Sequence, residues 1–332
     1  MGKLIDFSDP CLRTFLPVLL QDHTTGKNII WATDPPPELG VGFADEITLE
    51  QLDKVQLVPR VQKRLADQKK RTSKKAEVFT PTWVCEKMAD VAENDLKGED
   101  WKEYINKTCL EVTCGEAPFL TSRYDTTTGH MIAVPDRIGL LDRKLNVLAE
   151  QFSDYDMWMC WAISAYASTY GYEWQGDNLL LARCNLFLTL VENFRYRFDA
   201  KRLEIGCMPM FLDCIADIIS WNVWQMDGLK KTVPGTDIPC KIKDWKADSV
   251  LFRLLRRRSV LGRDRRETAG RCDGDALDGV SDGMRWYVWR AKLFGILLKK
   301  KDTRHCLTME MATFHLEGFC CLGCILIFSK GR

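Results

Sequence analysis

The sequence lacks a large net charge, a long apolar run and a leader-like N-terminus. The formal charge of its 332 residues is +1 at pH 7, which does not exclude DNA binding, because basic charge can be confined to one face. The longest apolar run, residues 318–328, is too short to cross a bilayer. We therefore expect a soluble, cytoplasmic protein without a membrane partner.

A disulfide scaffold is not expected either, although the chain has 14 cysteines. They are scattered through apolar segments, where reduced and mostly buried thiols are the better interpretation. With 46% hydrophobic residues, a chain of this length can bury one large α/β core or two modest ones.

Residues 110–120 carry the clearest local pattern. Short apolar and β-branched residues come first, a turn follows at Cys114-Gly115, and the apolar pair Phe119-Leu120 closes the stretch. This predicts a buried strand, a tight glycine turn and the start of the next element. Gly115 lets the backbone approach a ligand. Glu111 stands near the carboxyl end of the strand, where open α/β sheets bind nucleotide-like ligands.

Residues 76–89 predict a helix that begins at Thr80-Pro81. We expect Thr80 to be the N-cap and Pro81 to lie in the first turn. The spacing of Val84, Met88 and Val91 gives this helix an apolar face.

Two further strand ends are predicted. Residues 170–188 indicate a short strand that ends in Glu173, followed by an amphipathic helix with Leu179, Ala182, Asn185 and Leu186 on its apolar side. An acid at that position suits a ribose, because a carboxylate can accept from both hydroxyls. Residues 222–226 predict a strand that delivers Asp227-Gly228 into a loop, although Asp-Gly is also a common turn.

These segments together resemble the S-adenosylmethionine-dependent amino-methyltransferases of DNA. Residues 110–120 resemble motif I, with its acid, its Cys-Gly pair and Phe119, and residues 76–89 resemble the Thr-Pro element of motif X. Glu173 with the following Ala-Arg and Asn-Leu pairs resembles motif II, and Asp227 resembles the acid of motif III. Over residues 20–245 the chain is similar to a phage and bacterial family called restriction endonuclease subunit M.

The resemblance implies a doubly wound, Rossmann-like α/β methyltransferase sheet with helices on both faces and an irregular C-terminal tail. It implies S-adenosyl-L-methionine as cofactor and methyl transfer to the exocyclic amine of adenine in DNA. Double-stranded DNA and a restriction or specificity subunit are the implied partners. The implied cofactor-binding residues are Thr80, Pro81, Glu111, Thr113, Cys114, Gly115, Phe119, Glu173 and Asp227.

One motif of that family is missing. Its catalytic Asn/Asp-Pro-Pro-aromatic sequence does not occur after Asp227. Asp34-Pro35-Pro36 follows a strand predicted at residues 27–34 and supplies three of the four residues, but Pro37 cannot stack on a base as an aromatic ring would. We favour a proline-rich turn there and assign no catalytic residue. The alternative function is therefore a non-catalytic subunit that binds DNA or a protein partner.

The sequence divides into an N-terminal extension (residues 1–70), a cofactor-binding core (71–248) and an Arg- and Cys-rich tail (249–332). The tail is interpreted as a divergent DNA-contacting segment, as a zinc site, or as an out-of-frame reading that truncates the core. No metal is assigned, because the spacing is incomplete for a zinc site built from His305, Cys306, His315, Cys321 and Cys324. The basic stretch 58–75 is either a solvated helix face or a phosphate-binding segment.

Overall fold

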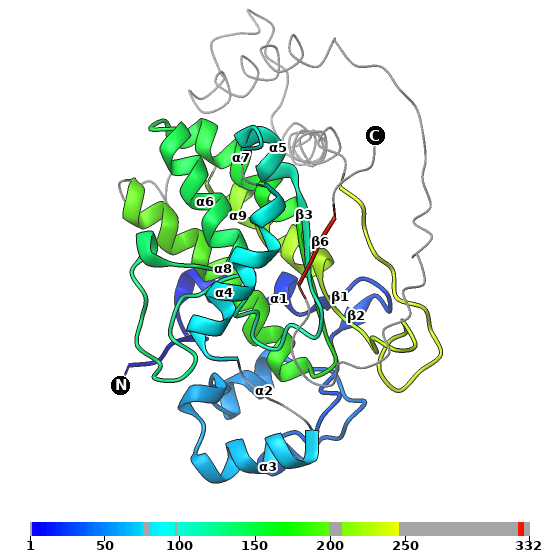
Figure 1. Ribbon diagram of the computed structural model, residues 1–332. Coiled ribbons are helices and arrows are strands. Elements are labelled where there is room, and N and C mark those ends of the chain that lie inside the picture. The colour runs from blue at the N-terminus through cyan, green and yellow to red at the C-terminus, as the bar shows by residue number, and fades with distance from the viewer. Residues whose placement is uncertain (1, 76–79, 97, 199–207, 246–324, 329–332) are drawn as a thin grey trace, which may run out of the picture.

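The computed structural model describes residues 2–75, 80–96, 98–198, 208–245 and 325–328. Its main sheet has the strand order β5-β4-β3-β6. The first three strands are parallel, whereas β6 runs antiparallel to β3 (Figure 1). The bounds are β3 Thr108–Glu111, β4 Thr169–Glu173, β5 Val223–Gln225 and β6 Ile325–Phe328. The fold is therefore mixed α/β with a small parallel sheet packed against helices, and the described residues do not form a full Rossmann sheet.

The three parallel strands end near the predicted positions, although Val112-Thr113 lie in the turn after β3 and β5 stops one residue before the predicted end. β3 ends at Glu111 and β4 ends at Glu173, while β5 covers most of the segment 222–226. The connection from β3 to β4 contains α6 (Leu140–Gln151) and α7 (Tyr155–Ala167), and the connection from β4 to β5 contains α8 (Gly176–Arg197) and α9 (Met208–Asn222). All three carboxyl ends consequently lie at one edge of the sheet.

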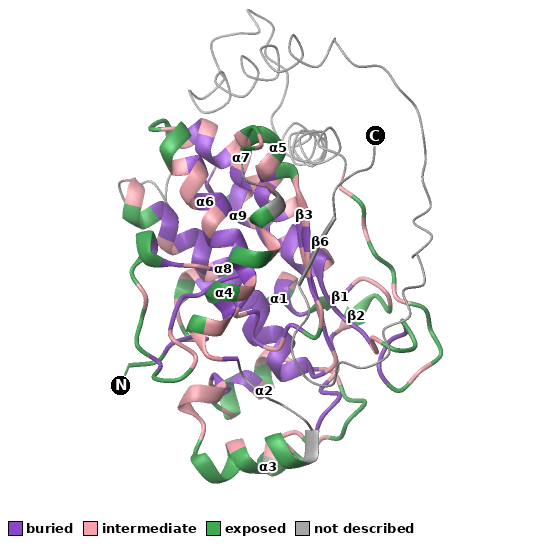
Figure 2. Ribbon diagram, viewed as in Figure 1, coloured by how far each residue is buried: buried purple, intermediate pink, exposed green. Residues whose placement is uncertain are grey.

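Helix α8 runs through the centre of the molecule. Nearly every residue from Gly176 to Phe194 is buried, so the amphipathic helix predicted here is wrong (Figure 2). The reason is that α8 contacts both β4 and β5 and also packs against α1 (Pro10–Leu19), α6 and α9. A helix enclosed on all sides has no solvent face to keep polar.

The N-terminal part shares this core. Leu16, Trp31 and Ile47 belong to the same cluster of buried residues as the hydrophobic side of α8. The boundary near residue 70 stays a prediction. The remaining elements before β3 are β1 Gln21–Asp22, β2 Lys27–Asn28, η1 Pro37–Leu39, α2 Leu49–Lys54, η2 Arg60–Gln62, α3 Leu65–Lys75, α4 Thr82–Ala92, η3 Asn94–Leu96 and α5 Trp101–Asn106, and η4 Val134–Asp136 precedes α6.

The sheet face that carries Tyr170, Tyr172 and Trp224 is covered by irregular chain. The Tyr170 hydroxyl donates to the carbonyl of Lys243 at 3.1 Å, and the backbone of Gly228 lies against the Tyr172 ring. In the described chain, residues 226–245 thus lie where a doubly wound sheet would carry a helix.

Several local predictions are corrected. Helix α4 begins at Thr82 with Pro81 as its cap residue, so Thr80 is not the N-cap; its carbonyl instead accepts from Thr126 Oγ1 at 2.8 Å. The buried side of α4 is formed by Cys85 and Ala89, and Val91 is 77% exposed. The face that packs is therefore displaced from the one that the apolar spacing indicated.

Two segments are less regular than predicted. The strand expected at residues 27–34 is limited to β2 and an isolated bridge at Ile30. No helix or strand starts near Leu120, because the chain forms turns and short 3₁₀ structure until α6 begins at Leu140.

The structure tests the predictions of buried thiols and of no membrane-spanning segment for the described residues. Cys85, Cys109, Cys114 and Cys184 are buried free thiols. No helix among the described residues is long and apolar enough to cross a membrane. The residues proposed for a zinc site and most of the tail lie outside the described residues.

Candidate ligand site at the carboxyl ends of the parallel strands

Glu173 joins the end of β4 to the loop that follows β3. Its Oε2 accepts from the backbone N–H of Gly115 at 2.9 Å, and its Oε1 accepts from the N–H of Gln175 at 3.1 Å. The N–H of Cys114 donates to the carbonyl of Tyr172 at 2.8 Å. The glycine turn is therefore held across the end of the neighbouring strand, as parallel pairing of β3 and β4 requires.

The loop after β3 has an unusual backbone. Thr113, Gly115 and Ala117 have φ values of 51°, 55° and 62°. The left-handed region costs a non-glycine residue about 1–3 kcal/mol, and such residues cluster at ligand-binding loops. Thr113 is exposed and Gly115 is half-buried, so these two residues present loop backbone at the edge of the sheet.

Glu111 is the most deeply buried acid at this edge. Burial raises the pKa of its carboxyl group well above the ordinary value, and the charge of Glu173 acts in the same direction, whereas backbone hydrogen bonds from Phe119 and Leu120 oppose it. Its Oε2 has no hydrogen-bond partner among the described residues. Leaving a buried acceptor without a hydrogen bond costs folding free energy. This oxygen is therefore a candidate to accept a hydrogen bond from a ligand.

The start of α4 adjoins this acid. Burial, followed by the nearby charge of Glu111, raises the pKa of the Cys85 thiol to about 12. The Thr82 hydroxyl accepts from the N–H of Thr126 at 3.1 Å, which anchors the helix on the loop beyond Phe119. Thr80 is buried and Pro81 is half-buried. The structure thus brings the Thr80-Pro81 segment close to the end of β3.

Two predicted site residues have other surroundings. Phe119 is 2% exposed. Asp227 follows β5, and its Oδ1 accepts from the N–H groups of Leu229 and Lys230 at 2.9 and 3.1 Å, which is the turn that Asp-Gly alone predicts. Its neighbour Met226 donates from its N–H to the carbonyl of Glu173 at 3.0 Å, so Asp227 still lies beside the end of β4.

Asn185 belongs to the Asn-Leu pair that follows Glu173 in the motif II resemblance. It links α8 to the loop after β3. Its Nδ2 donates to the Glu116 carbonyl and to the Tyr124 hydroxyl, each at 3.0 Å, and its Oδ1 accepts from Arg123 at 3.1 Å. The side chain of Glu116 accepts from the Tyr124 hydroxyl and from the N–H of Arg60. These contacts fix the loop from its inner side.

Arg183, the arginine of the Ala-Arg pair after Glu173, is fully buried and joins distant parts of the fold. Its guanidinium donates to the carbonyls of Leu19 and Gln21 at the end of α1 and to those of Ser220 and Val223 at the end of α9, at 2.6 to 2.9 Å. Burial lowers its pKa to about 10. The cation therefore pairs with the negative ends of two helices, a structural role that the motif did not specify.

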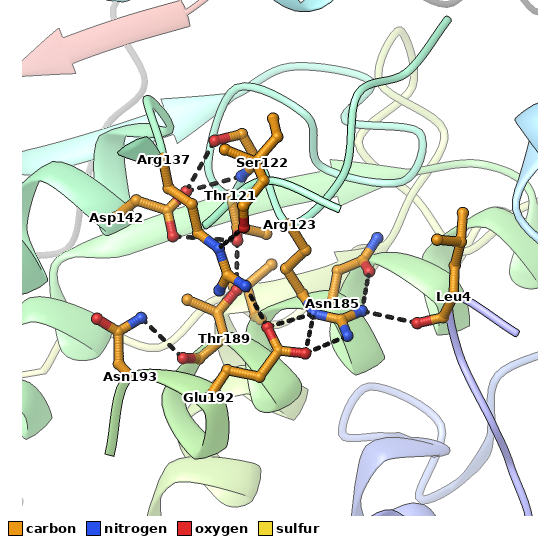
Figure 3. A network of polar contacts seen from close by, with 12 residues as sticks. Leu4, Thr121, Ser122, Arg123, Arg137, Asp142, Asn185, Thr189, Glu192 and Asn193 are labelled. Carbon is orange, nitrogen blue, oxygen red and sulfur yellow. Dashed lines mark hydrogen bonds and ion pairs between the residues drawn. The ribbon is translucent and has the colours of Figure 1, made fainter. Parts of the chain in front are cut away.

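The loop at residues 121–139 is anchored by a buried ionic network (Figure 3). Arg123 and Arg137 both pair with Glu192 of α8, Arg123 at 2.5 Å. Asp142 accepts from the N–H of Ser122 at 2.7 Å, and the hydroxyls of Thr121 and Thr189 share a hydrogen bond. The base of this loop is therefore tied to α8.

Sequence reasoning missed Gln175, Arg71 and Asp177. The Gln175 side chain accepts from Arg71 at 2.9 Å and from the Thr33 hydroxyl at 3.3 Å. Arg71 also pairs with Asp177 at 2.8 Å. The only sequence signal for Arg71 was the basic stretch 58–75. Its composition does not show which arginine is buried and which is exposed.

The acids Glu111 and Glu173 lie at one edge of the sheet, and carboxylates are acceptors for hydroxyl and amine donors. Among the described residues, no group of three or more His, Cys, Asp or Glu side chains could hold a metal ion. No protein-family model, curated protein or solved structure matches this chain.

Proposed function

We propose that the chain binds S-adenosyl-L-methionine at the carboxyl ends of β3, β4 and β5. The observation that carries this proposal is the Glu173 carboxylate, which ends the second parallel strand and holds the Gly115 N–H of the preceding loop at 2.9 Å. An acid and a glycine loop on neighbouring parallel strands are typical of sites for nucleoside-containing ligands.

The residues present fit this cofactor. Glu173 would accept from the ribose hydroxyls, and Glu111, whose Oε2 lacks a partner among the described residues, would accept from an amine. Asp227 would accept from the adenine amine through Oδ2, because its turn contacts with Leu229 and Lys230 use Oδ1. Thr80 and Pro81 would border the methionine end. Thr113, Cys114 and Gly115 would offer loop backbone.

We further propose that the activity is methyl transfer to the exocyclic amine of adenine in double-stranded DNA. The sulfonium of the cofactor supplies an activated methyl group, so the protein chiefly has to position the acceptor and expose the base. A doubly wound methyltransferase sheet belongs to this proposal.

The rival proposal is a non-catalytic subunit that binds DNA or a restriction partner. It is favoured by the missing Asn/Asp-Pro-Pro-aromatic sequence after Asp227. Transfer of labelled methyl groups from S-adenosylmethionine to duplex DNA separates the two, since only the enzyme labels the DNA.

Calorimetric titration with S-adenosylmethionine tests the site. Loss of charge-assisted hydrogen bonds worth about 1.5–3 kcal/mol should raise the Kd of Glu173→Ala roughly 10- to 150-fold. Asp227→Ala should also weaken binding. The control is Glu103→Ala, an exposed acid on α5, next to the opposite end of β3. Circular dichroism monitors folding. Wild-type protein without affinity, or unchanged Kd values in both site variants, would defeat the proposal.

A further inference from the structure

Helix α3 has an inner side that is fixed to the candidate site. Arg71 Nη1 pairs with Asp177 Oδ2 at 2.8 Å, and the two side chains are only 15% and 7% exposed. Lys63 contacts the same carboxylate oxygen at 3.7 Å. Desolvation acts against the charge of Asp177, but Lys63 and Arg71 outweigh it and lower its pKa. These contacts hold α3 at the start of α8, directly after Glu173 and Gln175.

The same segment is also fixed to the loop after β3. The N–H of Arg60 donates to Glu116 Oε1 at 2.6 Å, and the Arg60 guanidinium donates to Thr72 of α3 at 2.8 Å. Residues 60–75 therefore bridge the loops that follow β3 and β4. The position of α3 relative to the strand ends is set by the Arg60–Glu116 contact before the helix and by the Arg71–Asp177 pair within it.

The outer side of this segment is basic. Residues 58–75 contain a single acid, Asp67, and eight bases: Arg60, Lys63, Arg64, Lys69, Lys70, Arg71, Lys74 and Lys75. Arg71 and Lys63 are occupied by Asp177, whereas Arg64 and Lys69 are exposed. In a chain whose net charge is only +1, this is a local concentration of positive charge that complements a polyanion.

We propose that two exposed bases, Arg64 directly before α3 and Lys69 within it, bind backbone phosphates of double-stranded DNA and that Arg71 positions α3 at the edge of the candidate site. The proposal deepens the proposed function, because it assigns the surface that takes the DNA. Phosphate contacts of this kind set register and affinity without reading sequence.

The test measures DNA affinity against salt concentration with a duplex of mixed sequence and no cofactor. Each phosphate contact contributes about 0.9 to the slope of log K against log salt. The double variant Arg64→Ala/Lys69→Ala should therefore reduce the magnitude of the slope by about 1.8. The matched control is Lys102→Ala/Arg195→Ala, which removes an exposed lysine and an exposed arginine on α5 and near the far end of α8.

An unchanged slope in the α3 variant, or an equal fall in the control, would overturn the assignment. Tighter binding of duplex RNA or of single-stranded DNA of equal length would overturn the choice of partner. S-adenosylmethionine binding should be unchanged in Arg64→Ala/Lys69→Ala, which also reports that the variant is folded. If wild type binds DNA through α3 but does not bind the cofactor, the proposed function fails while this inference stands.

Discussion

Replacement of the buried Asp142 by asparagine should change how stability depends on pH. Asp142 is 1% exposed, and its carboxylate accepts from the N–H and hydroxyl of Ser122. Burial raises its pKa from 3.8 to about 6, although Arg137 and the hydrogen bonds from Ser122 oppose the shift. The folded state thus holds the proton more tightly than the unfolded chain does.

The sign and size follow from proton linkage. A group whose folded pKa is raised contributes stability that is fully present below pH 3.8 and is lost as the pH rises through about 6. A shift of roughly 2 units corresponds to about 3 kcal/mol. Asp142→Asn, which cannot ionise, should match the wild type near pH 3.5 and exceed its stability by up to about 3 kcal/mol at pH 7.

Urea unfolding at several pH values between 3.5 and 7.5 measures this difference, provided that the slope m is the same in both proteins. Other acids titrate in this range, so the quantity of interest is the difference between variant and wild type. Asp136→Asn is the control, because Asp136 is an exposed aspartate in η4, shortly before α6, which carries Asp142. A difference between wild type and Asp142→Asn that does not grow with pH would refute the reasoning.

Two further substitutions test the scaffold. Arg183→Met should destabilise the fold by about 2–4 kcal/mol in urea unfolding, because four backbone carbonyls lose their donor; a loss below about 0.5 kcal/mol would contradict the role assigned to Arg183. Gly176→Ala should destabilise the fold by a similar amount, because a Cβ there would collide with the carbonyl of Ile30. Thermal melting should show this as a lower Tm. An unchanged Tm in Gly176→Ala would show that this approach is looser than described.

The strand ends could be predicted from the sequence because their signals are local. Glu111 and Glu173 are predicted near strand ends and both strands end there, although the β-branched pair Val112-Thr113 after Glu111 lies in the turn. The packing of α8 depends on segments far away in the chain. A charged residue such as Arg183 suggests a solvent face, but Arg183 is buried and donates to the carbonyl of Leu19, 164 positions away. Helical periodicity cannot distinguish a solvated polar side chain from one that donates to buried carbonyls.

Sequence spacing also could not show that one of the bases in residues 58–75 is neutralised by a buried acid. Arg71 and Asp177 are 106 positions apart, so no spacing rule connects them, and Arg71 counted as one more cation for DNA. Its burial against Asp177 removes that charge from the surface but gives α3 a defined place beside Glu173. In the proposed function, a basic helix fixed at the strand ends would hold DNA where a bound cofactor would face it, so its position would compensate for one lost phosphate contact. A charge run should therefore be judged by which of its members have buried acidic partners, and only the remaining exposed bases are candidates for phosphate contact.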